Sequence, residues 1–308
     1  LQKALDKSPN ANSSARIKML MNNLDLCRVT VELNDLAQQI KKTDMPEISL
    51  LEKAKSLANW RINFLKNNQN SFVETQKRNM YNEKAFNLGF DLSVFEYMIG
   101  LSKVGGKREI VCAKIDSGKI KIDGALDELV WQKLRVMNVD LDKDSGSVSE
   151  VKTSAYMCYD SSFLYVGVKC LEPTMSEIRD SVAEHDGPVW NENDIEIFID
   201  YKYNKISFRQ FLANTLGTIS DFQKDDQGKD LNWESQAIVK VNKESDFWSM
   251  EIAIPLDSIT GDKINTNTVM GLNICRVRPF AVKNRYTCWA PTFGSFHEPA
   301  RFGKVVFR

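Results

Sequence analysis

The segment from Val189 to Asp200 brings together residue types that could hold a sugar ring. Its second half alternates between β-branched side chains and polar or aromatic ones: Ile195, Ile197 and Ile199 against Glu196, Phe198 and Asp200. This period of two predicts a strand whose isoleucine side faces a core. Trp190 precedes the strand, and an aromatic plane beside fixed polar groups can pack on a sugar and bond its hydroxyls. On this segment alone, an ordinary sandwich strand with an exposed acid is the favoured interpretation.

Motifs for hydrolytic or nucleotide chemistry are weak in this sequence. Glycoside hydrolysis needs two carboxylates on opposite sides of a bound sugar. Glu196 could supply one, but no spacing requires Glu192, Asp194 or Glu298 to oppose it. The chain has two histidines and lacks the G-x-S-x-G and glycine-rich nucleotide motifs. We therefore expect binding rather than catalysis, with a catalytic fragment as an alternative.

The overall composition excludes several classes of protein. Of 308 residues, 43% are apolar and 27% are charged, which is ordinary for a globular protein long enough for two domains. The 41 basic and 41 acidic side chains balance, so no net charge attracts nucleic acid or an anionic membrane. No apolar run reaches the roughly 18 residues of a membrane span. The chain begins at Leu1 without a signal-like segment, so we expect a piece of a longer protein.

The spacing of apolar residues divides the chain into two halves. Residues 1–105 have the three-to-four spacing of helices, with one helix expected after Ser13 and Ser14, one after Pro46 and one over residues 71–87. Two apolar stripes predict that the first helix is buried on two sides. This half is expected to be a helical domain or the tail of a truncated upstream domain, joined to the second half by residues 90–107.

Residues 106–308 change to a period of two, with turn residues about every 8 to 12 positions. Short strands without long helices between them predict an antiparallel β-sandwich, and hence a multidomain α+β chain. The expected strands are residues 110–115, 119–123, 153–159, 163–170, 194–200, 207–215, 235–241, 247–254, 270–279, 285–289 and 304–307.

Six cysteines show no zinc-binding spacing, and no metal ligand is assigned. Cys275 and Cys288 could face each other across a hairpin and form a disulfide. Alternatively, they are small buried apolar residues, as we expect for the other four. The count leaves the redox compartment open.

Several short motifs follow one another along residues 110–308. They are IDGALDE at 122–128 with Trp131, YDSSFLYV at 159–166, Trp190 ahead of DIEIFID at 194–200, Asn214 with Gly217-Thr218, EIAIP at 251–255, and a closing block of GLNI at 271–274, Trp289, FHEP at 296–299 and RFG at 301–303. In this order they resemble the family 9 carbohydrate-binding modules, β-sandwich domains found on xylanases and other glycoside hydrolases. The resemblance implies a jelly-roll-like sandwich that binds carbohydrate.

The resemblance also implies a sugar held between two aromatic side chains at one end of the sandwich. Trp190 and Phe296 match the two aromatic positions, and Glu196 matches a sugar-contacting acid. Two other polar contacts of the family are replaced by Leu212 and Cys275, so a different ligand, or none, is compatible with the sequence.

Alternation along the strands adds polar groups to this expected site. Asn214 and Asn273 share the face of Glu196 on neighbouring strands, and His297 could either bond a hydroxyl or cap a turn. The expected carbohydrate-binding residues are Trp190, Glu196, Asn214, Asn273, Phe296 and His297.

Partners and location follow from the same resemblance. We expect an oligosaccharide or polysaccharide ligand, an upstream catalytic domain in the same chain, and an extracellular or periplasmic location. No cofactor is expected apart from structural calcium, which the acidic loop Asp140–Asp144 could hold. The alternative function is a structural sandwich without sugar affinity that supports a neighbouring catalytic domain.

Overall fold

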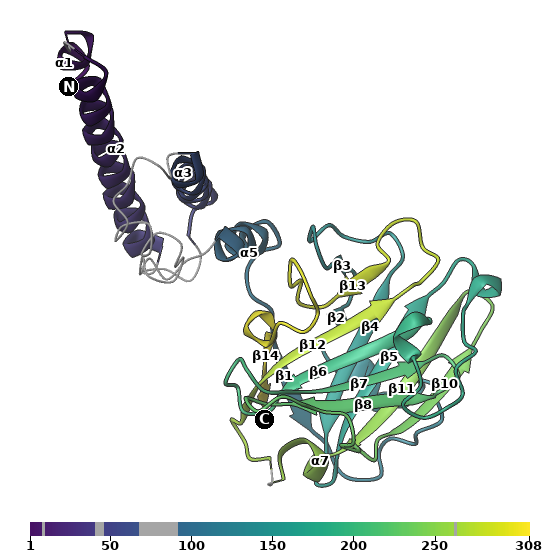
Figure 1. Ribbon diagram of the computed structural model, residues 1–308. Helices are drawn as coiled ribbons and strands as arrows, with labels where there is room; N and C mark the ends of the chain where they lie inside the picture. The colour runs from purple at the N-terminus through teal and green to yellow at the C-terminus, as the bar shows by residue number, and fades with distance from the viewer. Residues whose placement is uncertain (8–9, 41–45, 68–91, 262–263) are drawn as a thin grey trace. The chain divides into compact units, whose positions relative to one another are not determined.

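The computed structural model describes residues 1–7, 10–40, 46–67, 92–261 and 264–308 (Figure 1). The chain forms two compact units, Leu1–Gly106 and Lys107–Arg308. The break follows Gly105 and Gly106, whose φ angles of 79° and 92° suit glycine. It lies one residue from the boundary expected from the sequence. The helix expected over residues 71–87 lies outside the described residues.

The first unit is helical. Its described helices are α1 (Gln2–Asp6), α2 (Ala11–Ile40), α3 (Ile48–Asn67) and α5 (Leu92–Lys103). Their shared core consists of Leu33, Leu36, Ile40, Leu51, Ala54, Phe95 and Ile99. The expected junction thus contains α5, which packs Phe95 and Ile99 into this core.

Two expectations about α2 are wrong. The cap at its start is Asn10, whose Oδ1 accepts a 3.0 Å hydrogen bond from the Ser13 amide, rather than a serine. Burial on two sides is also not found, because Leu20, Leu24 and Val31 are 51%, 58% and 61% exposed. The core therefore covers one stripe of this helix.

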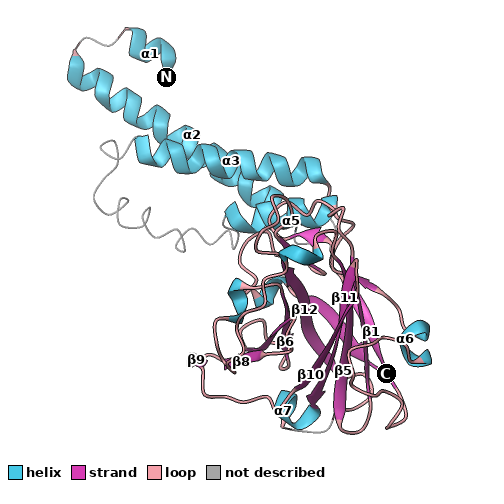
Figure 2. Cartoon of the chain, turned by 90° about the vertical axis from the view of Figure 1, so that its right-hand side faces the viewer, coloured by secondary structure: helices cyan, strands magenta, loops and turns pink. Residues whose placement is uncertain are grey.

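The second unit is a β-sandwich with a core between two sheets (Figure 2). One sheet has the order β10-β11-β5-β4, with β2 beside β4; the other has the order β14-β12-β6-β7-β8-β9, with β13 beside β12 and β3 beside β13. The strands are β1 (Glu109–Lys114), β2 (Met137–Asn138), β3 (Leu141–Asp142), β4 (Thr153–Tyr159), β5 (Phe163–Leu171), β6 (Asp194–Asp200), β7 (Phe208–Asn214), β8 (Ile219–Lys224), β9 (Lys229–Asp230), β10 (Ile238–Lys243), β11 (Phe247–Pro255), β12 (Val269–Val277), β13 (Tyr286–Cys288) and β14 (Gly303–Phe307). Short helices α6 (Leu129–Lys133) and α7 (Leu256–Thr260) complete it.

Strand β1 joins the two sheets. Its first residues, Glu109 to Cys112, pair with β14, and Ala113 and Lys114 pair with β4. Both pairings are parallel, whereas the other strand pairs of the described sandwich are antiparallel. The sequence therefore predicted the sandwich correctly, but the wholly antiparallel pairing was wrong at β1.

The strand expected over residues 119–123 is absent because backbone amides at its end donate hydrogen bonds to a side chain instead of to a partner strand. The amides of Asp123 and Gly124 donate 2.9 Å hydrogen bonds to Oε2 of Glu251, and the indole of Trp131 donates to its Oε1. A buried carboxylate thus takes donors that a strand would give to its partner. Conversely, the sequence did not predict strands β8 and β9. The strand expected at 235–241 begins and ends later, as β10.

Candidate functional site

The expected sugar-facing side chains lie on the outer face of the second sheet. Glu196 on β6 is opposite Leu212 on β7 and Cys275 on β12. Phe198, two residues later, is opposite Gln210 and Asn273 in the same way. This register confirms the alternation inferred from the sequence, since Ile195, Ile197 and Ile199 point into the core between the sheets.

A segment between β13 and β14, residues 289–302, covers this face. Asn273 fixes its beginning: its Nδ2 donates to the Ala290 carbonyl at 2.9 Å, and its Oδ1 accepts from the Ala290 amide at 3.0 Å. Further on, the rings of Phe296 and Phe302 lie 6.2 and 5.6 Å from the Phe198 ring. The face is therefore packed rather than open.

A chain of hydrogen bonds crosses the covered face. Nε2 of Gln210 donates to Oε2 of Glu196 at 2.7 Å, and Oε1 of Gln210 lies 2.8 Å from Nε2 of His297. A carbonyl oxygen accepts only, so this His297 nitrogen is the donor. The His297 ring also packs edge-on against Phe198 at 5.4 Å and stacks on Phe222 at 6.1 Å.

The environment shifts the pKa values of the two titratable groups at the ends of this chain of hydrogen bonds. Burial raises the pKa of Glu196 to about 7, although the Gln210 hydrogen bond opposes the rise. Burial and then the nearby Lys229 and Lys224 lower the pKa of His297 to about 4. At neutral pH the histidine is therefore uncharged, while the carboxyl of Glu196 is near its midpoint.

Asp194 adds a second buried acid at the start of β6. Its side chain is fully buried, and neither carboxyl oxygen has a hydrogen-bond partner in the described structure. Burial, with Glu196 and Glu192 nearby, raises its pKa well above the ordinary value. A protonated Asp194 relieves the repulsion that three neighbouring carboxylates would produce.

Glu192 holds the loop that leads into β6. Its Oε1 accepts hydrogen bonds from the Ser181 amide and hydroxyl and the Val182 amide, and its Oε2 accepts from Nδ2 of Asn214 at 2.7 Å. Burial alone would raise the pKa of Glu192, but these donors outweigh it and the pKa is lowered. Asn214 also accepts from the Leu216 and Thr218 amides through Oδ1. Asn214 and Glu192 thus shape the loop.

Trp190 lies in a short 3-10 helix, Val189–Asn191, and is 53% exposed. The preceding Val189 is fully buried and anchors the turn. No described aromatic ring contacts Trp190. About half of the Trp190 surface is therefore open to solvent.

The six expected residues differ in accessibility. Trp190 is exposed, and His297 is exposed as a whole residue although its ring packs against Phe198 and Phe222, whereas Glu196 and Phe296 are 6% and 8% exposed. Asn214 and Asn273 are fully buried and engaged in the bonds described above. The structure gathers Glu196, Phe296 and His297 around Phe198, and Phe296 presents no open ring to pair with Trp190. A sugar slot between these two aromatics stays a prediction.

Phe280 is an exposed aromatic residue that was not among the carbohydrate-binding residues expected from the sequence. It is 61% exposed in the loop between β12 and β13 and lines a cavity of about 40 Å³ together with Asn193, Thr174, Glu177 and Arg278. Val277 at the end of β12 pairs with Asp194 at the start of β6, so Phe280 and Trp190 extend from the same end of these two strands. An aromatic residue in a charged hairpin loop was the signal that could have identified it.

A larger cavity, about 790 Å³, lies apart from these aromatics. It is lined by β1 and by basic and apolar side chains, including Lys107, Arg108, Arg135 and Val136. The aromatic residue at its wall, Trp289, is 5% exposed. This cavity therefore lacks an open ring for stacking.

The acidic loop considered for calcium has protein partners. Asp140 forms an ion pair with Lys152 at 2.9 Å, and Asp144 pairs with Lys143. Oδ1 of Asp142 accepts from the Asp144 and Ser145 amides and the Ser145 hydroxyl. Calcium binding there stays a prediction.

The expected cross-strand cysteine pair exists, but it is not a disulfide. Cys275 and Cys288 are opposite each other on β12 and β13, and both are buried free thiols. Burial, and then the neighbouring Cys288 thiol, raises the pKa of Cys275 well above its ordinary value. Both behave as small apolar residues beneath the covering segment.

Solved structures with the same fold share little sequence with this chain. A family 9 carbohydrate-binding module from Caldicellulosiruptor kristjanssonii, in complex with cellotriose, has a TM-score of 0.50 and 16% identity over 65% of this chain and 94% of that chain. Its complex with glucose gives 0.50 and 17%, over 65% and 96%. A candidate carbohydrate-binding protein from Bacteroides uniformis ATCC 8492 gives 0.56 and 14%, over 66% and 100%. At such identities the likeness concerns the fold.

Comparison with curated protein sequences found no match. None of the described helices has the length and apolar character that crossing a membrane requires. The family model of the carbohydrate family 9 binding domain-like proteins matches residues 122–308, which is more than half of the chain and includes most of the sandwich. The chain therefore belongs to the carbohydrate family 9 binding domain-like family.

Proposed function

We propose that residues 107–308 bind a carbohydrate, with Trp190 as the ring on which the sugar packs. The observation that carries this proposal is the half-exposed indole, which a buried Val189 and the Glu192 hydrogen bonds hold at the entrance to β6. An exposed tryptophan held by rigid neighbours loses little entropy when a sugar packs on it. Family membership and the sugar-bound solved structures of the same fold support this function.

Phe280 is our proposed second contact, in place of the buried Phe296. Phe280 follows the end of β12, whose last residue pairs with the first residue of β6 shortly after Trp190. Polar side chains lie beside it. Thr174, Glu177 and Arg278 offer hydroxyl, carboxylate and guanidinium groups that can bond sugar hydroxyls. Exposed rings with polar groups beside them are the arrangement that sugar binding requires.

Calorimetric titration with glucose, cellotriose and xylotriose, after a screen on a glycan array, tests the proposal. Burial of one aromatic side chain contributes about 1.5–3 kcal/mol, so Trp190→Ala should weaken binding about 10- to 100-fold. Trp60→Ala is the matched control, because Trp60 is a 38% exposed tryptophan in the helical unit. Equal affinities of the wild-type and Trp190→Ala proteins would contradict the proposal.

Two phenylalanine variants separate the rings. Phe280→Ala should weaken sugar binding without changing the free energy of unfolding. Phe296→Ala should lower that free energy, because Phe296 packs against Phe198 and Tyr286. The reverse result would restore Phe296 as the second ring.

A structural sandwich without sugar affinity is the second candidate function. The burial of Phe296 and of Glu196 favours it, as do Leu212 and Cys275 at positions where the family places polar contacts. Under this function, a folded protein binds no glycan on the array, and Trp190→Ala changes nothing.

We also infer that the chain is the accessory region of a larger glycoside hydrolase that acts outside the cytoplasm on polysaccharide. The resemblance to modules carried by such enzymes, and a separate helical unit ahead of the sandwich, support this inference. Immunoblots of the culture medium and cell fractions of the producing organism, with a glycan-hydrolysis assay on the native protein, test it. Protein confined to the cytoplasm, or native protein without hydrolytic activity, would contradict it.

A further inference from the structure

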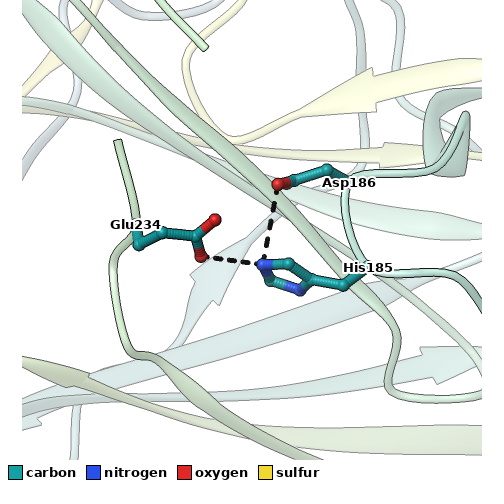
Figure 3. Close-up of side chains that lie close together, drawn as sticks. All are labelled: His185, Asp186 and Glu234. Carbon is teal, nitrogen blue, oxygen red and sulfur yellow. Dashed lines mark hydrogen bonds and ion pairs between the residues drawn. The ribbon is translucent and has the colours of Figure 1, made fainter. Parts of the chain in front are cut away.

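A histidine and two carboxylates converge at the surface of the sandwich. His185 and Asp186 lie in the loop before β6, and Glu234 lies between β9 and β10. Nε2 of His185 is 2.8 Å from Oε2 of Glu234 and 3.7 Å from Oδ2 of Asp186 (Figure 3). The three ligand atoms all lie within 4.8 Å of one another.

These separations suit a tetrahedral metal ion. Zinc bonds of about 2.0–2.1 Å to nitrogen and oxygen place tetrahedral ligands about 3.3 Å apart. The observed 2.8 and 3.7 Å lie on either side of that value, so each contact changes by about half an ångström. The three side chains are 52%, 37% and 45% exposed, which leaves them room for this adjustment.

Asp221 provides a second and independent observation. It lies on β8, is 4% exposed, and its Oδ1 has no hydrogen-bond partner in the described structure. Its amide donates to Oδ1 of Asp186 at 3.2 Å, and its Oδ2 accepts from Ser235. Ser235, which bonds Oδ2 of Asp221, directly follows Glu234 in the chain, so Asp221 lies beside the cluster. A buried carboxyl oxygen without a donor is costly unless a cation satisfies it.

The charge of the cluster is unbalanced. Two carboxylates lie beside one imidazole, with the buried Asp221 next to Asp186, and His185 is the sole cation paired with Asp186 or Glu234 in the described part of the chain. We propose that His185, Asp186 and Glu234 bind a divalent transition-metal ion, with zinc as the best fit. An imidazole nitrogen among the ligands favours zinc over calcium, which takes oxygen ligands.

The bound ion would connect two segments of the sandwich. It would join the loop that leads to Trp190 to the segment that crosses from β9 to β10. Without metal, the His185–Glu234 contact is an exposed ion pair, which contributes little to stability. A metal bond is stronger, so the loop ahead of Trp190 should be held more firmly when the ion is bound.

Zinc titration of the untagged chain tests the proposal. A histidine tag would bind zinc, and the exposed thiol of Cys27 could do so, so the protein should be untagged and carry Cys27→Ser. We expect one zinc ion per chain, a rise of the unfolding temperature with zinc, and no comparable rise with calcium. Cobalt in place of zinc should give the strong visible absorption of a tetrahedral nitrogen and oxygen site.

Three variants make the test specific. His185→Ala and Glu234→Gln should each weaken zinc binding at least tenfold. Glu109→Gln should leave zinc binding unchanged, because Glu109 is an exposed acid paired with Lys304 elsewhere on the sandwich. Unfolding curves in the presence of EDTA show whether each variant folds. Equal zinc affinity of His185→Ala and the parent, or equal binding of calcium, would overturn the proposal.

Discussion

Gln210 donates a 2.7 Å hydrogen bond to Glu196 inside the protein, where both side chains are more than nine-tenths buried. The other end of the same amide bonds His297 on the covering segment. One side chain thus links an acid of the sheet to a histidine of the segment above it. Because both ends titrate at shifted pH, the stability of this region should depend on pH in two opposite ways.

The first prediction concerns Glu196. Its pKa is raised from 4.5 to about 7, so the folded protein holds this proton more tightly than the unfolded chain does. The resulting stability is fully present below about pH 4.5 and is lost as pH rises through 7. Between these two pH values, we expect the free energy of unfolding of the wild type to fall by about 3 kcal/mol relative to that of Glu196→Gln. Urea unfolding at each pH measures this difference. Parallel pH curves for the two proteins would contradict this.

His297 should act in the opposite direction. Its pKa is lowered from 6.5 to about 4, so the unfolded chain binds the proton more tightly in this range. Stability from the neutral imidazole is present above about pH 6.5 and is lost as pH falls through 4. His297→Gln should therefore flatten the loss of stability on the acid side of the unfolding profile. A variant as acid-sensitive as wild type would exclude this role for His297.

Replacement of Gln210 by alanine should destabilise the sandwich. Gln210→Ala leaves the buried Glu196 carboxyl without its donor, and such a loss costs about 1–3 kcal/mol. Gln227→Ala is the control, because Gln227 is exposed in the turn before β9. The measurement is the free energy of unfolding in urea, and similar values for the two variants would show that the bond contributes little.

Glu172 should be more important to stability than an exposed acid of the same type. It accepts from Arg276 at 2.9 Å and from Arg278 at 2.7 Å, and Arg276 is 1% exposed. Glu172→Ala leaves a buried guanidinium unpaired, which costs about 3–5 kcal/mol. Glu109→Ala breaks an exposed pair and should cost about 0–1 kcal/mol. Thermal and urea unfolding distinguish these magnitudes.

Gly124 should tolerate no side chain. A Cβ there would lie 2.6 Å from the backbone carbonyl carbon of Val241, and its φ is +93°. Gly118 has a similar φ of +76° with nothing within 4 Å, so Gly118→Ala isolates the conformational cost of about 1–2 kcal/mol. Gly124→Ala should lose more stability than this control in the same unfolding assay. Equal losses would mean that the β10–β11 hairpin moves away at little cost.

Strand patterns that repeat every second residue predicted much of the sandwich. The bounds 194–200 coincide with those of β6, and β4, β5, β7, β11 and β14 lie within one residue of the expected ends. These strands have side chains of different polarity on their two faces, which alternation records directly. The short pairs β2, β3 and β9 were missed because two residues give no period.

The site was harder to predict because the exposure of a side chain depends on segments that are distant in the sequence. Alternation placed Glu196, Gln210 and Asn273 on one face, and the register agrees. That face is then covered by a segment almost a hundred residues later in the chain, which buries Phe296 against Phe198. Nothing in the spacing around Phe296 distinguishes an aromatic ring that lines a slot from one that fills it.

The parallel pairing of β1 with β14 has a mechanical consequence. The two strands run side by side in the same direction, so the chain enters the sandwich beside Lys304 and leaves it beside Cys112, at the opposite end of the pair. A force that pulls the start of β1 and the end of β14 apart would slide these strands past each other. The hydrogen bonds between β1 and β14 would then carry this shear force together, whereas peeling the strands apart would break the bonds one at a time.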